Sequence, residues 1–210
     1  MKVVAFNGSP KKEGNTYQAI NIVASELEKE GIEVEIVHVG NKVIRGCLAC
    51  NACAKNKDGK CIVENDEVNL WIQKMNEADG IILGSPVHYS AIAGTMKSFL
   101  DRAFYVASGM GMLRHKVGAS VVAVRRSGGT TTFNQLNNFI NYAEMLMPST
   151  NYWNVIHGTT PGEVLQDEEG VQIMRVLGKN MAWLMKSIEK SKDDLEKPSK
   201  ENKIYTNFVR

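Results

Sequence analysis

Short apolar segments alternate with longer amphipathic ones along most of the chain, and this alternation limits the possible folds sharply. The apolar segments 80–85 and 117–124 are hydrophobic at nearly every position, which is typical of strands buried on both faces. The segment 95–107 instead repeats its apolar residues at the spacing of one helix face. Strands and helices in this order predict an α/β fold with a doubly wound five-stranded parallel sheet and helices on both faces.

Turn and cap residues set the expected boundaries. Gly31 is expected to end the first helix, Asn65 or Asp66 to cap the second, and Pro86 to break the third strand. The expected strands are the opening apolar run, 32–39, 80–85, 117–124 and 152–156. The expected helices are 17–30, 66–79, 95–107, 131–147 and 168–190.

Length and composition favour one domain. The chain has 210 residues, and we expect a domain over 1–190, with a cysteine-rich loop over 41–65, and a polar tail over 191–210. The tail becomes apolar at 204–209, which predicts either a hook that docks on a partner subunit or a disordered end.

Charge and hydropathy exclude some partners. The net charge is +2 without a basic stripe, which argues against nucleic acid, and no apolar run is long enough to span a membrane. The N-terminus leads directly into a strand without a visible secretion signal. We therefore expect a cytoplasmic location and reduced cysteines.

The first connection has the order of parts that forms a phosphate cradle. The opening apolar run stops at a turn of Gly8, Ser9 and Pro10, and a helix with a hydroxyl-rich entry follows at Asn15 and Thr16. Backbone N–H groups and the positive end of a helix bind anions in such a loop. The alternative is an ordinary turn in which Asn15 or Thr16 caps the helix.

Two common nucleotide-binding loops do not match this segment. A Walker loop requires four residues between its glycines and then a Lys, but five residues separate Gly8 from Gly14, and Asn15 stands in place of the Lys. The dinucleotide fingerprint requires Gly where this chain has Pro10. A loop of amides and hydroxyls suits a phosphate monoester.

Two further loops are expected at the same edge of the sheet, because both follow strands at their carboxyl ends. One presents His88 and Tyr89, and the other combines Arg125 and Arg126 with the flexible Gly128–Gly129 turn. A phosphate attached to a flat ring system would use all three loops, and flavin mononucleotide (FMN) fits that description. Taken singly, a solvated His and a plain turn are the simpler interpretations.

The same residues carry a family resemblance. The chain resembles the flavodoxin-like NAD(P)H-dependent FMN reductase family from residue 1 to about 190, and 206–210 resemble tails in that family. The matching motifs are Gly8-Ser9-Pro10, Gly14-Asn15-Thr16, and the segments 78–87 and 96–102. The resemblance implies FMN as cofactor and a homodimer or homotetramer.

The loops and the resemblance together yield a set of candidate FMN-binding residues. The resemblance implies that the first loop holds the phosphate, that the second lies beside the isoalloxazine, and that the third lies near its polar rim. The candidates are Ser9, Lys11, Gly14, Asn15, Thr16, Pro86, Val87, His88, Tyr89, Arg125, Ser127, Gly128, Gly129 and Thr130. No side chain needs to act as a nucleophile, although His88 or Tyr89 could donate a proton to the reduced flavin or the substrate.

Four cysteines form a compact motif between the second strand and the next helix. Cys47, Cys50, Cys53 and Cys61 have the spacing C-x2-C-x2-C-x7-C, and thiolates at such steps can bind a 4Fe–4S cluster. The motif strengthens the resemblance to the iron–sulfur flavoprotein branch of the family. Zinc, which usually takes two separated pairs, and free or redox-active thiols stay open as alternatives.

The resulting functional hypothesis is an FMN-dependent oxidoreductase. It would pass electrons from NAD(P)H or an electron-carrier protein to a quinone, a free flavin or another small acceptor. One alternative is a non-catalytic FMN electron carrier, which the slightly basic charge disfavours because such carriers tend to be strongly acidic. Another is a binder of phosphorylated ligands without redox activity.

Overall fold

The computed structural model describes residues 1–206 and 208. The strands are β1 (Lys2–Asn7), β2 (Glu33–His38), β3 (Gly80–His88), β4 (Ala91–Ile92), β5 (Val117–Val124) and β6 (Val155–His157). The helices are α1 (Asn15–Lys29), α2 (Ala52–Asn56), α3 (Val68–Glu77), α4 (Gly94–Met110), α5 (Gly129–Tyr142) and α6 (Glu168–Ser191), with a short 3-10 helix, η1 (Glu163–Gln166).

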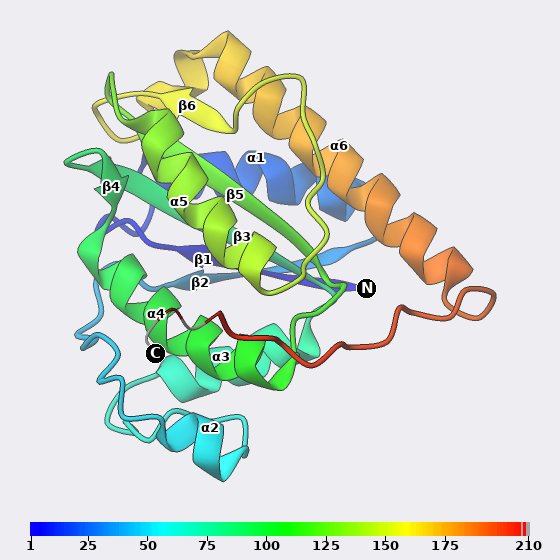
Figure 1. Cartoon of the computed structure of the whole chain (residues 1–210). Coiled ribbons are helices and arrows are strands. Elements are labelled where there is room, and N and C mark those ends of the chain that lie inside the picture. The colour runs from blue at the N-terminus through cyan, green and yellow to red at the C-terminus, as the bar shows by residue number, and fades with distance from the viewer. Residues whose placement is uncertain (207, 209–210) are drawn as a thin grey trace.

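The central sheet has five parallel strands in the order β2-β1-β3-β5-β6, and the small β4 pairs antiparallel with β3. Helices α1 and α6 cover one face, and α3, α4 and α5 cover the other (Figure 1). Alternate residues of β1 enter the two cores, since Val4 and Phe6 face α3–α5 while Val3 and Ala5 face α1 and α6. The prediction of a doubly wound five-stranded parallel sheet is confirmed.

The third strand corrects one prediction. Pro86 does not break β3, which continues to His88 and turns back into β4. The pairing of β3 with β1 ends at Gly84, whereas the pairing with β5 continues to Pro86. Beyond Gly84 one side of β3 is therefore free, and a residue without an N–H is tolerated there.

Several expected boundaries also differ. Helix α5 covers 129–142 instead of 131–147, because Glu144 adopts a left-handed φ of 55° and the chain then turns to pair Leu146 with the start of β5. The last strand is 155–157 instead of 152–156, and α3 begins at Val68 instead of Asp66. The short α2 within the cysteine-rich segment was not predicted.

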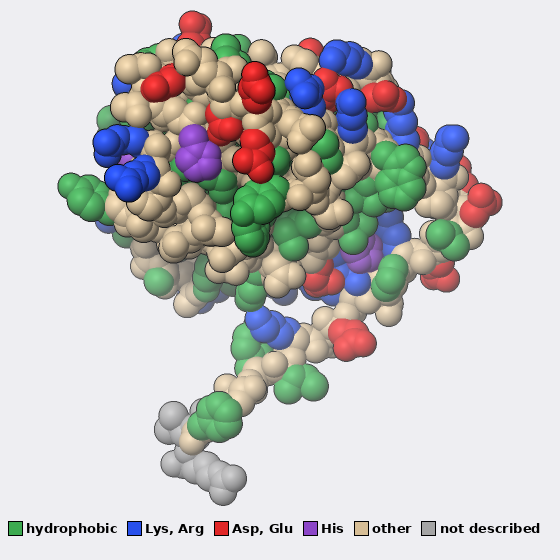
Figure 2. All heavy atoms as spheres, turned by 90° about the horizontal axis from the view of Figure 1, so that it is seen from above, with side chains coloured by type: hydrophobic (Ala, Val, Ile, Leu, Met, Phe, Trp, Pro, Cys, Tyr) green, Lys and Arg blue, Asp and Glu red, His purple; other side chains and the backbone are tan. Residues whose placement is uncertain are grey.

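The tail after α6 folds back along the α3–α4 side of its own chain (Figure 1). Arg114 donates to the carbonyl oxygens of Pro198 at 2.8 Å and Ser199 at 3.1 Å. Figure 2 shows the end of the tail projecting from the body of the molecule, and Tyr205 is 78% exposed. Docking on a partner subunit stays a prediction, and 207 and 209–210 lie outside the described residues. Of the helices in the described part of the chain, none combines the length and hydropathy that crossing a membrane requires.

Candidate functional site

The loop after β1 is closed by hydrogen bonds from its own residues and from β3. The Asn7 side chain accepts from the Ser9 N–H at 3.0 Å and donates to the Lys12 carbonyl at 2.9 Å. The Gly8 N–H donates to the Gly84 carbonyl at 2.8 Å. The loop is therefore held to the buried part of the sheet before any ligand binds.

The end of β2 supports the same loop from the other side. The His38 ring nitrogen Nε2 lies 2.8 Å from the Ser9 carbonyl oxygen. Gly40 passes so close that a Cβ on it would lie 2.1 Å from that oxygen. Only glycine allows this approach of two backbones, so Gly40 is a structural requirement of the loop that sequence reasoning missed.

The entry of α1 has unused hydrogen-bonding capacity. Among the described residues, no side chain caps this helix, whose N-cap is Gly14. The Thr16 hydroxyl is buried, and within the described part of the chain it has no hydrogen-bond partner. A buried polar group without a partner and an uncapped helix N-terminus both favour an anion at this position. The arrangement therefore fits the phosphate of FMN.

Asn15 ties this entry to a distant loop. Its side-chain oxygen accepts the Gly162 N–H at 2.8 Å, which joins the start of α1 to the connection between β6 and η1. The oxygen is thus used inside the protein, while the amide nitrogen is the half of the side chain that can donate to a phosphate. The FMN contact of Asn15 stays a prediction.

The second loop is a tight hairpin between β3 and β4. Pro86 and Val87 are half-buried, whereas His88 and Tyr89 are exposed at the turn. Tyr89 and Ser90 have φ values of 50° and 59°, the left-handed conformation that two-residue hairpins require and that Asn and Gly usually supply. Such strained residues cluster at ligand sites, and the structure places this pair on the predicted flavin side.

The third loop packs against the second. Gly128 has φ of 87°, and a Cβ on it would lie 2.7 Å from the Ser90 hydroxyl oxygen. Gly129 is buried as the first residue of α5. Arg125, Ser127 and Thr130 remain exposed around this turn. The three loops follow β1, β3 and β5, which are neighbours in the sheet, so the predicted FMN-binding residues lie along one edge.

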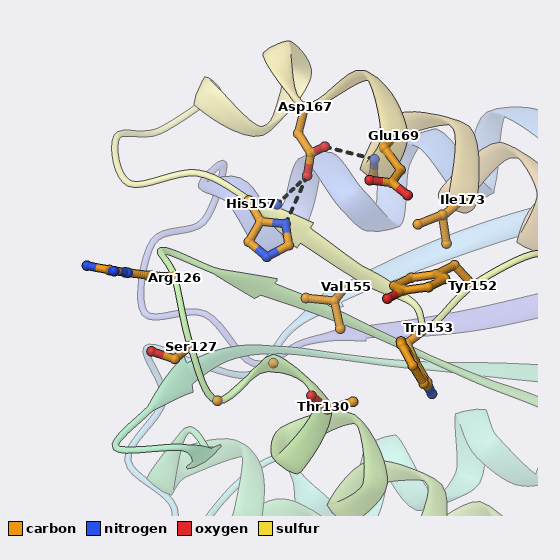
Figure 3. Close-up of a pocket in the computed structure, with 13 residues that line it drawn as sticks. Arg126, Ser127, Thr130, Tyr152, Trp153, Val155, His157, Asp167, Glu169 and Ile173 are labelled. Atoms are coloured by element: carbon orange, nitrogen blue, oxygen red, sulfur yellow. Dashed lines mark hydrogen bonds and ion pairs between the residues drawn. The ribbon is translucent and has the colours of Figure 1, made fainter.

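A cavity of about 380 Å³ lies on the β6 side of the third loop (Figure 3). Tyr152 and Trp153 form an edge-on aromatic pair with centroids 4.3 Å apart on one side of it. The Asp167 carboxylate accepts the His157 backbone N–H at 2.7 Å and lies 3.2 Å from its Nδ1. Ser127, Gly128, Gly129 and Thr130 of its lining belong to the predicted FMN-binding set, whereas sequence reasoning missed the side formed by β6 and α6. The position of Asp167 directly before α6 signalled its role as helix cap.

The folded protein favours the ionised form of Asp167, because its surroundings lower the pKa of this carboxyl group. Burial raises its pKa, but hydrogen bonds from Gly170 and His157 outweigh burial and lower it below the ordinary value. Its second oxygen accepts the Gly170 N–H at 2.9 Å. The hydrogen bonds from His157 and Gly170 therefore fix the start of α6 beside the loop that Asn15 contacts.

The four cysteines lie around one narrow cavity of about 20 Å³ beside α4. All four are free thiols; Cys47 and Cys50 are exposed, whereas Cys53 and Cys61 are half-buried. Within residues 1–206 and 208, no three potential ligands are arranged to hold a single metal ion. Four thiols around one cavity are the donor set that a 4Fe–4S cluster requires.

The backbone of this segment is strained. Ala49, Asn51 and Lys57 have φ values of 51°, 58° and 53°, a left-handed conformation that costs Ala and Lys about 1–2 kcal/mol each and that Asn adopts more readily. Burial is the main cause that raises the pKa of the Cys53 thiol. The backbone between the cysteines thus adopts left-handed conformations that residues other than glycine rarely take.

Comparisons with known proteins agree with this geometry. Residues 1–160 match the family described as NADPH-dependent FMN reductase. An iron–sulfur flavoprotein of Methanocaldococcus jannaschii is 36% identical over 197 residues, which cover 90% of this chain and 100% of the relative. An iron–sulfur flavoprotein of Archaeoglobus fulgidus is 34% identical over 173 residues, or 81% of this chain and 83% of the relative.

A solved structure shares the fold. RosB, solved with bound 8-demethyl-8-formylriboflavin-5'-phosphate, superposes with a TM-score of 0.71 at 15% identity, covering 100% of this chain and 93% of that one. Family, relatives and fold all point to an FMN-binding protein. The chain belongs to the NADPH-dependent FMN reductase family and, within it, to the iron–sulfur flavoprotein branch.

Proposed function

We propose that this protein is an FMN-dependent oxidoreductase that passes electrons from NAD(P)H or a carrier protein to a quinone, a free flavin or another small acceptor. The observation that carries the proposal is the buried Thr16 hydroxyl, which has no hydrogen-bond partner among the described residues, at the start of α1, which no described side chain caps. FMN exchanges electrons in pairs or singly, and it supplies the redox chemistry at this site.

The protein's own contribution is binding and orientation. Thr16, the Asn15 amide nitrogen and the N–H groups of the first helical turn would hold the phosphate as donors. Ser9 and Gly14 shape this loop, and the exposed Lys11 adds a positive charge at its rim. Pro86 and Val87 provide an apolar surface for the ring, and Gly128 brings backbone groups to its polar edge.

The four cysteines would hold a 4Fe–4S cluster, which supplies single-electron exchange with a protein partner. Their free thiols, their shared cavity and the similarity to relatives known as iron–sulfur flavoproteins support this assignment. A pure electron carrier is the second candidate, because the exposed cysteine loop offers a surface to a redox protein.

Further parts of the proposal concern organisation. We place residues 1–190 in one domain and expect a homodimer or homotetramer in which the apolar end of the tail contacts another subunit. Free thiols and the absence of a basic stripe support a cytoplasmic protein without nucleic-acid or membrane partners.

Flavin retention tests the cradle. The double variant Asn15→Ala/Thr16→Val should lose FMN during gel filtration, because it removes two side-chain donors to the phosphate. Only the backbone N–H groups of the first helical turn then remain to bind it. The variant Thr131→Val, at an exposed position of α5 outside the candidate FMN-binding residues, is the control and should retain its FMN. A double variant that stays fully yellow contradicts the phosphate assignment.

Steady-state kinetics separate the two functions. The oxidoreductase should oxidise NADH or NADPH continuously when a soluble quinone is present, and the flavin should bleach anaerobically with the nucleotide alone. Reduction only by a carrier protein or dithionite, without nucleotide-dependent turnover, supports the electron carrier instead.

A further inference from the structure

Arg102 occupies an unusual position on α4. It is the largest fully buried side chain of the described residues, at 1% exposure, yet it is a cation. A buried guanidinium is costly unless its donors are paired, so its partners reveal why it is kept there.

The partners of Arg102 all belong to the cysteine-rich segment or its flanks. The guanidinium pairs with the Asp66 carboxylate through both terminal nitrogens, and NH2 also donates to the Val63 carbonyl at 2.9 Å. NH1 reaches the Arg45 carbonyl at 3.5 Å, before the first cysteine. A single side chain therefore holds both ends of the loop that contains the cysteines.

The remaining donor of Arg102, its Nε–H, points at the sulfur of Cys61, a candidate cluster ligand. Arg102 Nε lies 3.4 Å from Cys61 Sγ, with the N–H directed at the sulfur. A neutral thiol is a weak acceptor, so a buried guanidinium donor gains little from it. A thiolate or a cluster-bound sulfur carries negative charge, which makes the same bond charge-assisted and strong.

Two neighbours on α4 complete the contact. Ser98, Arg102 and Tyr105 are spaced along one face of the helix; Arg102 and Tyr105 hydrogen-bond to the loop, and Ser98 lies near it. The Tyr105 hydroxyl donates to the Asn51 side chain at 2.6 Å, between Cys50 and Cys53. A Cβ on Gly46 would lie 3.9 Å from the Ser98 hydroxyl oxygen. This face of α4 is a preformed seat for the cysteine loop.

We propose that Arg102 is a positioning residue for the iron–sulfur cluster: it orients the Cys61 sulfur, whose backbone Asn69 holds, and stabilises negative charge on that sulfur through the Nε–H···Sγ bond, with Asp66 fixing the guanidinium. This inference rests on the proposed cluster. Hydrogen bonds and positive charge at the sulfurs favour the reduced, more negative state of a cluster, so Arg102 raises its midpoint potential.

The test uses the full chain with FMN bound. The double variant Arg102→Met/Asp66→Asn removes both charges together and avoids stranding a buried carboxylate. Arg102→Lys keeps the charge but loses the fork geometry. Lys97→Met removes an exposed cation one turn away on the same helix, which pairs with Asp101 at 2.6 Å, and serves as the matched control.

Iron, sulfide and FMN per chain are measured after anaerobic reconstitution, followed by chelator competition and a redox titration of the cluster. The double variant should retain FMN, hold iron about 10- to 100-fold less tightly, and show a lower cluster potential. Arg102→Lys should fall between the double variant and the wild type, and Lys97→Met should match the wild type.

The outcomes separate the two claims. Wild-type protein that retains FMN but takes up no iron refutes the cluster itself. Wild-type protein that loads normally, together with a double variant of equal chelator resistance and equal potential, refutes only the role of Arg102. If the double variant loses FMN or unfolds, the test rests on Arg102→Lys. Iron retention and cluster potential equal to those of the wild type in Arg102→Lys then overturn the inference.

Discussion

The phosphate loop (residues 8–16) and the cysteine loop (residues 41–65) are held in opposite ways. The phosphate loop is anchored by its two ends, where Ser9 and Thr16 are almost fully buried, while 10–13 between them are exposed. The cysteine loop is largely exposed, contains one five-residue helix, and is attached to the body through side chains of α4 and through Asn69 of α3. The two ends of the phosphate loop are thus part of the buried core, whereas the cysteine loop lies on the surface and is attached to the core by side-chain hydrogen bonds.

This difference indicates how each site depends on its ligand. The phosphate loop has its backbone bonded to β3 and supported by β2 before FMN arrives. The cysteine loop has strained left-handed residues and few buried apolar contacts, so we expect a bound cluster to supply much of its order. The four predictions below test this contrast, beginning with the largest expected effect.

Gly40→Ala should damage the preformed site most. The added Cβ would meet the Ser9 carbonyl oxygen at 2.1 Å, so the backbone must shift, at a cost of about 1–3 kcal/mol in the free energy of unfolding. The variant should also release FMN. Gly109→Ala, in α4 with open space around it, is the control and should be neutral or stabilising. Retained flavin and unchanged denaturant unfolding in Gly40→Ala would disprove rigid support of the loop.

Limited proteolysis should expose the weaker attachment of the cysteine loop. Iron-free protein with FMN bound should be cut first within 41–65, and reconstitution with iron and sulfide should slow that cleavage about 10-fold or more. Mass spectrometry of the fragments identifies the first cut. Initial cleavage within 8–16 would reverse the ranking of the two loops.

Asp167→Ala should weaken the loop that Asn15 joins to α1. Loss of the helix cap costs about 1 kcal/mol at neutral pH. Because hydrogen bonds outweigh burial and hold the folded pKa of Asp167 below 3.8, its contribution is complete above that pH. It disappears as pH falls through the lower folded pKa. Denaturant unfolding of the wild type and of Asp167→Ala, from neutral pH down through this pKa, should show the difference in their free energies of unfolding shrinking in acid. A difference that stays constant with pH would refute the role of the Asp167 carboxylate as helix cap.

Lys57→Gly should have the smallest effect, and it should stabilise. Lys57 has a φ of 53°, which glycine adopts without strain, so iron-free protein should gain about 1 kcal/mol. Lys55→Gly, inside α2, is the matched control and should lose up to about 1 kcal/mol. Thermal unfolding compares the two variants, and equal losses in both would show that Lys57 carries no strain.

Local patterns predicted the architecture because each of them acts over a few residues. The β-branched run 117–124 became β5 at the expected bounds, and Gly31 followed the end of α1. Pro86 was misread because a proline's effect on a strand depends on which neighbour is present, and the neighbour β1 is more than seventy residues away in sequence. The end of α5 was misread for a similar reason, since pairing with β5 decides where the chain leaves the helix.

The candidate site divides in the same way. Sequence alone predicted the family and the FMN cofactor, which the comparisons confirm, because glycine and hydroxyl spacing in a βα turn is a local property. It also predicted that three loops meet at one edge of the sheet, and their contacts with FMN stay a prediction. Only the tertiary structure decided that Gly40 must be glycine, that Asn15 bonds to Gly162, and that Arg102 is buried against Cys61. Those facts depend on which distant backbones and side chains meet, and close packing of the whole fold determines that.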